Sequence, residues 1–374
     1  MLKKRIYLDN NATTCLDPRV IEAMMAELND LPSNPSSIHS FGREAKAKLS
    51  ASRKRIADYL RVSPQSILFT SGGTEGLNFL IRGMVDENAH IITSNTEHSS
   101  VEKTLSHLEN RGVSITYLPS GLRGAIQPEQ LEEAILPETS LIVLGAVNGE
   151  TGVKIDLKSI AKVAHKHQIP LIIDAVAWIG KEPIVIPEGV TAMACSAHKF
   201  HGPHGVGFVF LSTEKAIEPL IRGGYQENSL RAGTENLPGI IGLSKAIELL
   251  DTELEAATFR MKSLRERFEN GLFQQLSDIY INGDGPRVVN TVNVAFMGVE
   301  GEVLLLLLDQ AGIAVSHGSA CSSGSLQPSR VLLSMGIPRK RANGSLRFSL
   351  SRFTKEEEID TCLETLSALV KKLR

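Results

Sequence analysis

Lys199 and Asp174 are the two side chains whose types and positions point most directly to chemistry. Lys199 closes the run Cys-Ser-Ala-His-Lys at 195–199, and Asp174 ends the apolar run Leu-Ile-Ile-Asp at 171–174. A lysine amine forms Schiff bases, and a strand-end carboxylate can hold the proton of a pyridinium nitrogen. Pyridoxal phosphate requires both groups, and 199 − 174 = 25 positions separate them here. The alternatives are a surface lysine and a carboxylate that caps a strand or helix.

A glycine-rich turn, Thr-Ser-Gly-Gly-Thr-Glu-Gly at 70–76, follows a β-prone run and precedes a helical pattern. Glycines such as Gly73 let the backbone approach a ligand closely, and the amides at a helix N-terminus favour a phosphate. Ser196 and His198, beside Lys199, are candidate additional phosphate donors. Turns of this kind also occur as plain structure.

Three further residues are candidates for chemistry. Cys321 lies in a Gly- and Ser-rich stretch with little local apolar packing, so its thiolate could reach a substrate atom as a nucleophile or remain a quiet, half-buried thiol. His98 follows a β-prone run and could stack on a cofactor ring and move protons, or be solvated. Arg347 alternates with apolar residues, and its planar fork suits either a substrate carboxylate or a structural ion pair.

Composition limits the class of protein. The 374 residues suffice for two domains, and 40 basic against 42 acidic residues, without a dense basic block, give no footprint for nucleic-acid binding. The four cysteines form neither a disulfide scaffold nor a metal-binding pattern. The N-terminus lacks the apolar core of a signal peptide, and the apolar run at 303–308 is too short to span a bilayer. We expect a soluble, cytoplasmic protein that binds a small molecule, with no metal and no membrane contact.

The order of patterns predicts an α/β fold. Short apolar runs alternate with helical patterns between residues 66 and 211, which indicates a mostly parallel sheet with helices on both faces. A helix is expected at 157–168, where apolar residues recur at helical spacing. The expected strands are 66–70, 90–93, 141–144, 171–174 and 206–211.

The C-terminal third changes character. Apolar residues at intervals of three and four predict a long amphipathic helix at 254–276 that leads into a second domain, with a boundary near residue 253. Thr354 and Glu357 have the spacing of a capping box, so a last helix is expected after Thr354. Its buried face would carry Ile359, Leu363, Leu366 and Val370.

Taken together, these motifs make the chain resemble the NifS/IscS-type cysteine desulfurases, which have the class V aminotransferase scaffold of fold-type I. The resemblance implies a large domain at 15–253, with a mostly parallel seven-stranded sheet between helices. It also implies a smaller α+β domain from 1–14 and 254–374 that carries a cysteine loop at about 316–328. The stretches that carry the resemblance lie at 7–14, 34–39, 71–75, 96–98, 196–199, 231–234, 318–321 and 347–350.

The resemblance also implies a role for each site residue. Lys199 would bind pyridoxal 5'-phosphate as a Schiff base, Asp174 would face its pyridine nitrogen and His98 would stack on its ring. Cys321 would take the sulfur of L-cysteine as a persulfide, release alanine and pass the sulfur to an iron–sulfur scaffold or another acceptor protein. The phosphate would be held by Gly73, Thr74, Ser196 and His198, with Thr234 from the partner subunit of a homodimer, and the substrate by Arg347 and Asn148.

Two positions depart from the family pattern. Gly149 stands where the family has Asn, and Ala177 where it has Gln, so two amides expected near the cofactor's phenolic oxygen are missing; Asn148 could replace one of them. His204, where Lys is common, is a lesser change. We therefore expect cofactor binding to persist with weakened or altered catalysis. Two alternatives remain open at this point: a selenocysteine lyase-like or other β-elimination enzyme, and a weakly active homologue that serves as a sulfur-relay partner.

Overall fold

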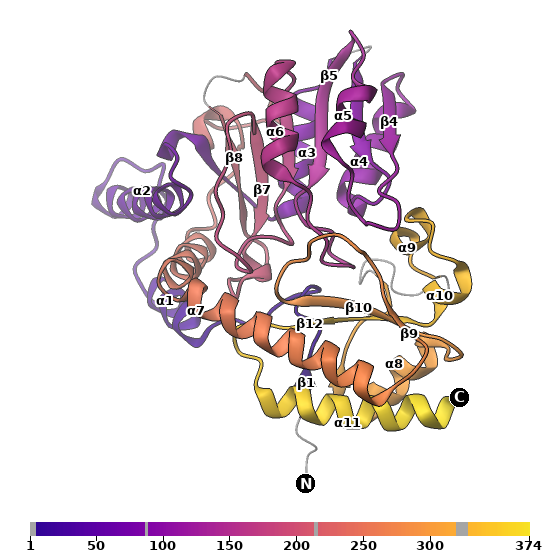
Figure 1. Cartoon of the computed structure of the whole chain (residues 1–374). Helices are drawn as coiled ribbons and strands as arrows, with labels where there is room; N and C mark the ends of the chain where they lie inside the picture. Colours follow the sequence, from indigo (N-terminus) through magenta and orange to yellow (C-terminus); the bar gives the residue numbers. More distant parts are fainter. Residues whose placement is uncertain (1–4, 87–88, 213–215, 319–327) are drawn as a thin grey trace.

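The computed structural model describes residues 5–86, 89–212, 216–318 and 328–374. Figure 1 shows a large sheet with helices on both sides and, beneath it, a smaller β structure bordered by α7 and α11. In the described part of the chain, the helices are α1 (Pro18–Leu28), α2 (Ser40–Leu60), α3 (Gly73–Gly83), α4 (Ser99–Glu109), α5 (Pro128–Ala134), α6 (Leu157–Lys166), α7 (Leu237–Gln275), α8 (Gly301–Gln310), α9 (Arg330–Ser334), α10 (Arg339–Asn343) and α11 (Glu356–Leu373), with 3-10 turns η1 (Pro64–Ser66), η2 (Ala197–Lys199) and η3 (Gln226–Ser229).

The large sheet confirms the predicted mostly parallel, seven-stranded architecture. Its order is β2-β8-β7-β6-β5-β3-β4, and β8 alone among these described strands runs antiparallel to both of its neighbours. In the register of the parallel strands, Gly145 pairs with Asp174 and Asp174 with Ala194, so β5, β6 and β7 end at the same edge. The strands are β2 (Ile67–Thr70), β3 (His90–Ser94), β4 (Ser114–Leu118), β5 (Thr139–Gly145), β6 (Leu171–Asp174), β7 (Ala192–Ser196) and β8 (Gly207–Leu211).

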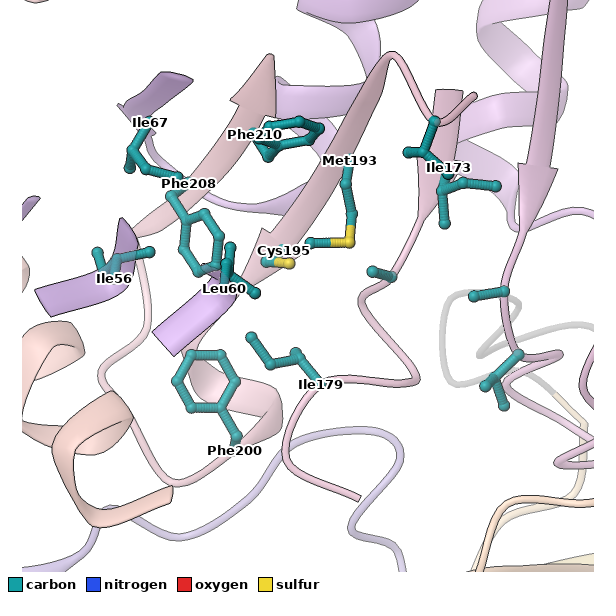
Figure 2. Packing of buried hydrophobic residues seen from close by; sticks show 14 of the residues in the cluster. Ile56, Leu60, Ile67, Ile173, Ile179, Met193, Cys195, Phe200, Phe208 and Phe210 are labelled. Atoms are coloured by element: carbon teal, nitrogen blue, oxygen red, sulfur yellow. The ribbon is translucent and has the colours of Figure 1, made fainter. Parts of the chain in front are cut away.

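Alternate residues of the central strands pack on opposite faces of the sheet, which explains why these runs are apolar throughout. Ile142 and Leu144 of β5 join a cluster with α2, α6 and α7, whereas Leu141 and Val143 join one with α3 and α4. Figure 2 shows the first cluster, where side chains of β7 and β8 meet α2 and the turns beyond the strands. Packing on both faces of the sheet therefore fixes the strand ends.

The smaller β structure joins the two ends of the chain. β9 (Ile279–Ile281), β10 (Thr291–Phe296) and β12 (Ser345–Ser349) form an antiparallel sheet in the order β12-β10-β9. β1 (Ile6–Tyr7) pairs in parallel with β11 (Ile313–Ala314), and Asp9 bridges to Ser349. The N-terminal segment thus lies beside strand β12, which carries Arg347.

The long helix begins earlier than the sequence pattern predicted. α7 runs without interruption from Leu237, so it crosses residue 253. The first half of α7 is buried on several sides among α1, α2 and the sheet. Apolar residues therefore do not recur there on a single face, as they do at 254–276. The division into 15–253 and the remaining segments stays a prediction. It is supported by a separate apolar cluster that joins Ile6 and Leu8 to residues between 264 and 370.

The last helix starts one residue later than the predicted capping box required. Its N-cap is Lys355, whose amide donates to the Glu358 carboxylate at 2.9 Å. The Thr354 hydroxyl instead accepts from the Ser351 amide at 2.9 Å. The predicted buried face at Ile359, Leu363, Leu366 and Val370 is confirmed. Within the part of the chain that the structure covers, no helix combines the length and apolarity needed to cross a membrane.

Candidate active site

A cavity of about 660 Å³ lies where β3, β5, β6 and β7 end, between the large sheet and the smaller β structure. The carboxyl edge of an open α/β sheet is where ligands usually bind. The lining contains most of the residues that the sequence singled out, but not Thr234, and Cys321 lies outside the described residues. The predicted residues that line it are Gly73, Thr74, His98, Asn148, Asp174, Ser196, His198, Lys199 and Arg347.

Lys199 reaches the cavity from the short turn η2, which follows β7 directly. Its Nζ donates to the carbonyl oxygens of Asn11, by a short contact, and of Ala12 at 2.9 Å. Both acceptors belong to the N-terminal segment, 188 and 187 positions away in sequence. The amine is therefore held in place by main-chain oxygens of a distant segment.

Asp174 is buried at the end of β6, and its Oδ1 accepts from the Val176 amide at 2.9 Å. Burial raises the pKa of this carboxyl, while nearby His98 and Lys199 oppose the shift. A cationic ring nitrogen placed against the carboxylate would offset its desolvation in the same way. The position thus fits a pyridinium partner.

His98 caps the N-terminus of α4. Its Nδ1 accepts from the Ser100 amide at 3.1 Å and lies 2.7 Å from the Ser100 hydroxyl. Because Nδ1 is an acceptor, the proton of the neutral ring is on Nε2. Burial lowers the pKa of His98, partly opposed by Asp174, so the ring favours this uncharged form.

The N-terminus of α3 provides an anion cradle. Gly72 is the N-cap residue and has no side chain, so no capping side chain accepts hydrogen bonds from the first amides of the helix. A Cβ at Gly73 would lie 2.5 Å from Val176 Cγ2, and one at Gly72 would lie 3.3 Å from the Ser196 hydroxyl. The glycines therefore let this backbone approach both the segment after Asp174 and the end of β7.

His198 lines the same cavity as the N-terminus of α3, and its ring is uncharged near neutral pH. Burial, with smaller effects of Lys199 and His204, lowers the pKa of His198 to about 4. The Thr13 hydroxyl lies 3.1 Å from His198 Nδ1 and 2.8 Å from His204 Nε2, and the two rings stack at 5.1 Å. Thr13 therefore orients the His198 ring through Nδ1 and leaves Nε2 without a contact to this hydroxyl.

Arg347 forms the ion pair that the sequence left open. Its guanidinium contacts the Asp9 carboxylate at 2.6 Å and donates to the Gly149 carbonyl at 3.1 Å. Its Nε is buried and has no hydrogen-bond partner among the described residues. Arg347 also lines the cavity, so its role toward a substrate carboxylate stays a prediction.

The two departures from the family pattern are neighbours in the wall of the cavity. A Cβ on Gly149 would lie 4.0 Å from the Cβ of Ala177, with no closer neighbour among the described residues. Asn148 does not fill this space: its Oδ1 accepts from the Glu150 and Thr151 amides, and its Nδ2 donates to the Thr96 carbonyl. The contacts favour a structural use of the Asn148 amide, and its predicted substrate role remains untested.

Sequence reasoning missed several residues of the site. Glu97 is a buried residue of the cavity wall. Burial raises its pKa to about 7, and the Ser94 hydroxyl donates to Oε1 at 2.6 Å. Asn11 and Thr13 contact Lys199 and His198. All three lie in stretches that carry the family resemblance, which was the available signal. Among the described residues, no group of three or more His, Cys, Asp or Glu side chains is placed to hold a metal ion.

Comparison with known proteins shows the family. The model of the family described as aminotransferase class-V matches residues 6–362. This chain belongs to that family. Its members depend on pyridoxal 5'-phosphate, and the residues described above fit this cofactor: an anion cradle at α3, a buried carboxylate at Asp174 and an amine at Lys199.

Individual relatives match this chain over nearly its whole length. A protein named cysteine desulfurase IscS from Dictyoglomus turgidum is 42% identical, covering 100% of this chain and 96% of the relative. A cysteine desulfurase from Klebsiella pneumoniae is 44% identical, with 99% and 94% covered. A solved NifS-like protein superimposes with a TM-score of 0.91 at 34% identity, covering 99% and 100%. A structure described as SspA in complex with cysteine has a TM-score of 0.84 at 32% identity, covering 94% and 100%.

Proposed function

We propose that the protein is a cysteine desulfurase that converts L-cysteine to L-alanine and supplies sulfur for iron–sulfur cluster assembly. The observation that carries this proposal is the placement of Lys199 and Asp174 at the ends of adjacent strands in one cavity. The full-length relatives named as cysteine desulfurases favour this reaction over the selenocysteine lyase-like and turnover-free alternatives.

Different residues of the site would bind different parts of the cofactor. The first amides of α3 at Gly73 and Thr74, together with Ser196 and His198, would hold its phosphate, and Lys199 would hold its aldehyde carbon. Asp174 would keep the ring nitrogen protonated, and His98 would cover the ring. The bound cofactor supplies an electron sink for the bonds at the substrate's α-carbon.

The chain itself orients the substrate and moves protons. Arg347 would bind the α-carboxylate through the part of its guanidinium that Asp9 does not occupy. Lys199 would accept and return a proton at Nζ, whose position the Asn11 and Ala12 carbonyls fix. His98, with its proton on Nε2, is the second group able to donate toward the cavity.

Cys321 is proposed to take the sulfur. The Cβ–S bond of cysteine breaks, a bond forms between that sulfur and the Cys321 sulfur, and the thiol proton of Cys321 ends on the methyl group of alanine. The products are alanine and a Cys321 persulfide, so atoms and electrons balance without an added oxidant. An iron–sulfur scaffold or another acceptor protein would then take up the sulfane sulfur.

A homodimer would complete the site. Thr234 does not line the cavity of its own chain, which agrees with its expected contribution to the partner's phosphate site. Large apolar side chains are exposed on α1 and the following segment, including Leu28 and Leu31. Ile38 and Tyr225 are 91% and 93% exposed. Burial of these side chains against a second copy would remove them from water.

Absorption spectra and product analysis test the proposal. Purified protein with pyridoxal 5'-phosphate should absorb in the visible range, the spectrum should change on adding cysteine, and alanine and sulfide should form with a reductant. Cys321→Ser should abolish sulfide release, whereas Cys15→Ser, which removes an exposed thiol elsewhere, should leave it near the parent rate. A Cys321→Ser protein that releases sulfide as fast as the parent would contradict the assigned nucleophile. A protein that stays colourless with the cofactor would contradict the reaction.

A further inference from the structure

Lys181 is a buried lysine that the proposed reaction does not use. The residue is 3% exposed, and its Nζ donates to the main-chain carbonyl of Lys199 at 2.8 Å. Lysines are rarely buried this completely unless they are paired with a carboxylate. Among the described residues, no carboxylate forms an ion pair with Lys181. This burial without a counter-charge calls for a physical explanation.

The contact connects two segments that face the cavity. Lys181 ends the segment that starts at Asp174, and Lys199 ends the turn after β7. Gly180 has φ +77°, and a Cβ there would lie 2.5 Å from the Cβ of Phe200, so the two backbones approach as closely as glycine allows. Figure 2 shows Ile179 and Phe200 on these two segments within one apolar cluster.

Lys181 is also fixed from its other side. Its carbonyl accepts from the Thr258 hydroxyl of α7 at 2.9 Å, and its amide donates to the Trp178 carbonyl at 3.1 Å. The side chain therefore extends from an anchored backbone to the carbonyl of Lys199. A shift of Lys181 would be transmitted to the main chain that carries the Lys199 amine.

The charges that face Lys181 are positive. They are Lys199 on η2 and Arg352 after β12, while His198 and His201 are neighbouring imidazoles. Burial, followed by Lys199 and Arg352, lowers the pKa of Lys181 to about 7. The acidic group of this cluster, Asp17, is paired with Arg352 and Arg19 and faces His201. A positive charge on Lys181 acts on Lys199 in the direction opposite to the negative charge of Asp174, so loss of the Lys181 charge would favour the charged form of the Lys199 amine.

We infer that Lys181 is a positioning residue for Lys199: it holds the main chain that carries Lys199, and its charge favours the uncharged, nucleophilic form of the Lys199 amine. This inference rests on the proposed function only in taking Lys199 as the amine that binds the cofactor. The positioning of the main chain and the effect of the charge both influence the reaction of the Lys199 amine with the cofactor's aldehyde, which takes place before any substrate is bound.

The test measures how fast apoprotein captures pyridoxal 5'-phosphate across a pH series. The product is trapped with borohydride and located at Lys199 by mass spectrometry. Lys181→Gln keeps a hydrogen-bond donor but loses the charge, so we expect its capture to be up to about tenfold slower than that of the parent below pH 7, where Lys181 is charged, and to approach the parent rate above pH 7. Lys181→Arg keeps the charge and should capture the cofactor at the parent rate below pH 7. Lys162→Met, which removes an exposed lysine of α6, is the matched control.

Each outcome decides a separate question. If Lys181→Gln differs from the parent and from Lys181→Arg only by a pH-independent factor, the charge effect is refuted and the residue is purely structural. Lys181→Met also lacks the charge, so the pH dependence of its capture decides in the same way if the Gln variant does not fold. If the parent protein captures no cofactor at Lys199 at any pH, the proposed function fails first, and with it the basis of the inference.

Discussion

Restoring the two missing amides should raise activity cooperatively. Gly149 has no positive φ, and a Cβ added there would meet the Ala177 Cβ at 4.0 Å, so the backbone and the first side-chain atom of Gly149→Asn are accommodated without strain. The Gly149 carbonyl is already held by Asn11 at 3.0 Å and by Arg347 at 3.1 Å, so the new side chain starts from a fixed backbone. Ala177→Gln would add a second amide on the neighbouring position, whose Cβ lies 4.0 Å from that of position 149.

The expected magnitude follows from these contacts. One hydrogen bond to a charged oxygen is worth about 1.5 kcal/mol, which is about tenfold in kcat/KM for each single variant. Side chains in direct contact are usually coupled by at least about 0.5 kcal/mol, so the double variant should depart from the product of the single effects by roughly twofold or more.

The assay is alanine formation from cysteine by the parent, both single variants and the double variant. Ala51→Gln, an added amide on an exposed position of α2, serves as the control and should have no effect. A double variant whose kcat/KM stays within about twofold of the parent would refute the reasoning. It would mean that the space between positions 149 and 177 does not limit the reaction.

Three other changes test separate parts of the structure. Gly73→Ala should cost about 1–3 kcal/mol in thermal unfolding and speed cofactor release, because the new Cβ would lie 2.5 Å from Val176 Cγ2; unchanged stability would contradict the close approach. Glu97 has its pKa raised from 4.5 to about 7, so the folded state keeps a proton that the unfolded state loses, and stability should fall as pH rises from about 4.5 to 7. Glu97→Gln should flatten this part of the profile in denaturant titrations, and an equally steep fall would exclude Glu97 as its source. Thr13→Val removes the hydroxyl between His198 and His204, and the resulting loss of about 1 kcal/mol should weaken cofactor binding about fivefold by equilibrium dialysis, whereas parent affinity would show that the bridge is dispensable.

Local apolar runs predicted the strands β2, β3, β5, β6 and β8 of the large sheet, whereas β4 and the small-residue strand β7 were not among the strands expected from the sequence. An apolar run such as 171–174 is buried on both faces of a parallel sheet wherever it occurs, so its composition is enough to predict a strand. The last helix was predicted to start after Thr354, and only the register of its first turn was wrong, because Glu358 rather than Glu357 accepts the capping hydrogen bond. The first half of α7 escaped prediction because it is surrounded by other elements and has no exposed face to give a period.

The sequence by itself determined the chemical groups of the site: a lysine after a small-residue stretch, an acid at the end of an apolar run and a glycine-rich helix start. Their roles follow from residue type and from position on a strand, which depend on local composition. Only the tertiary structure decided their partners. It joined Arg347 to Asp9, placed position 149 against 177, and buried Lys181 against the main chain of Lys199. Such contacts depend on how distant segments pack, and no local pattern encodes which polar groups meet when that packing excludes water.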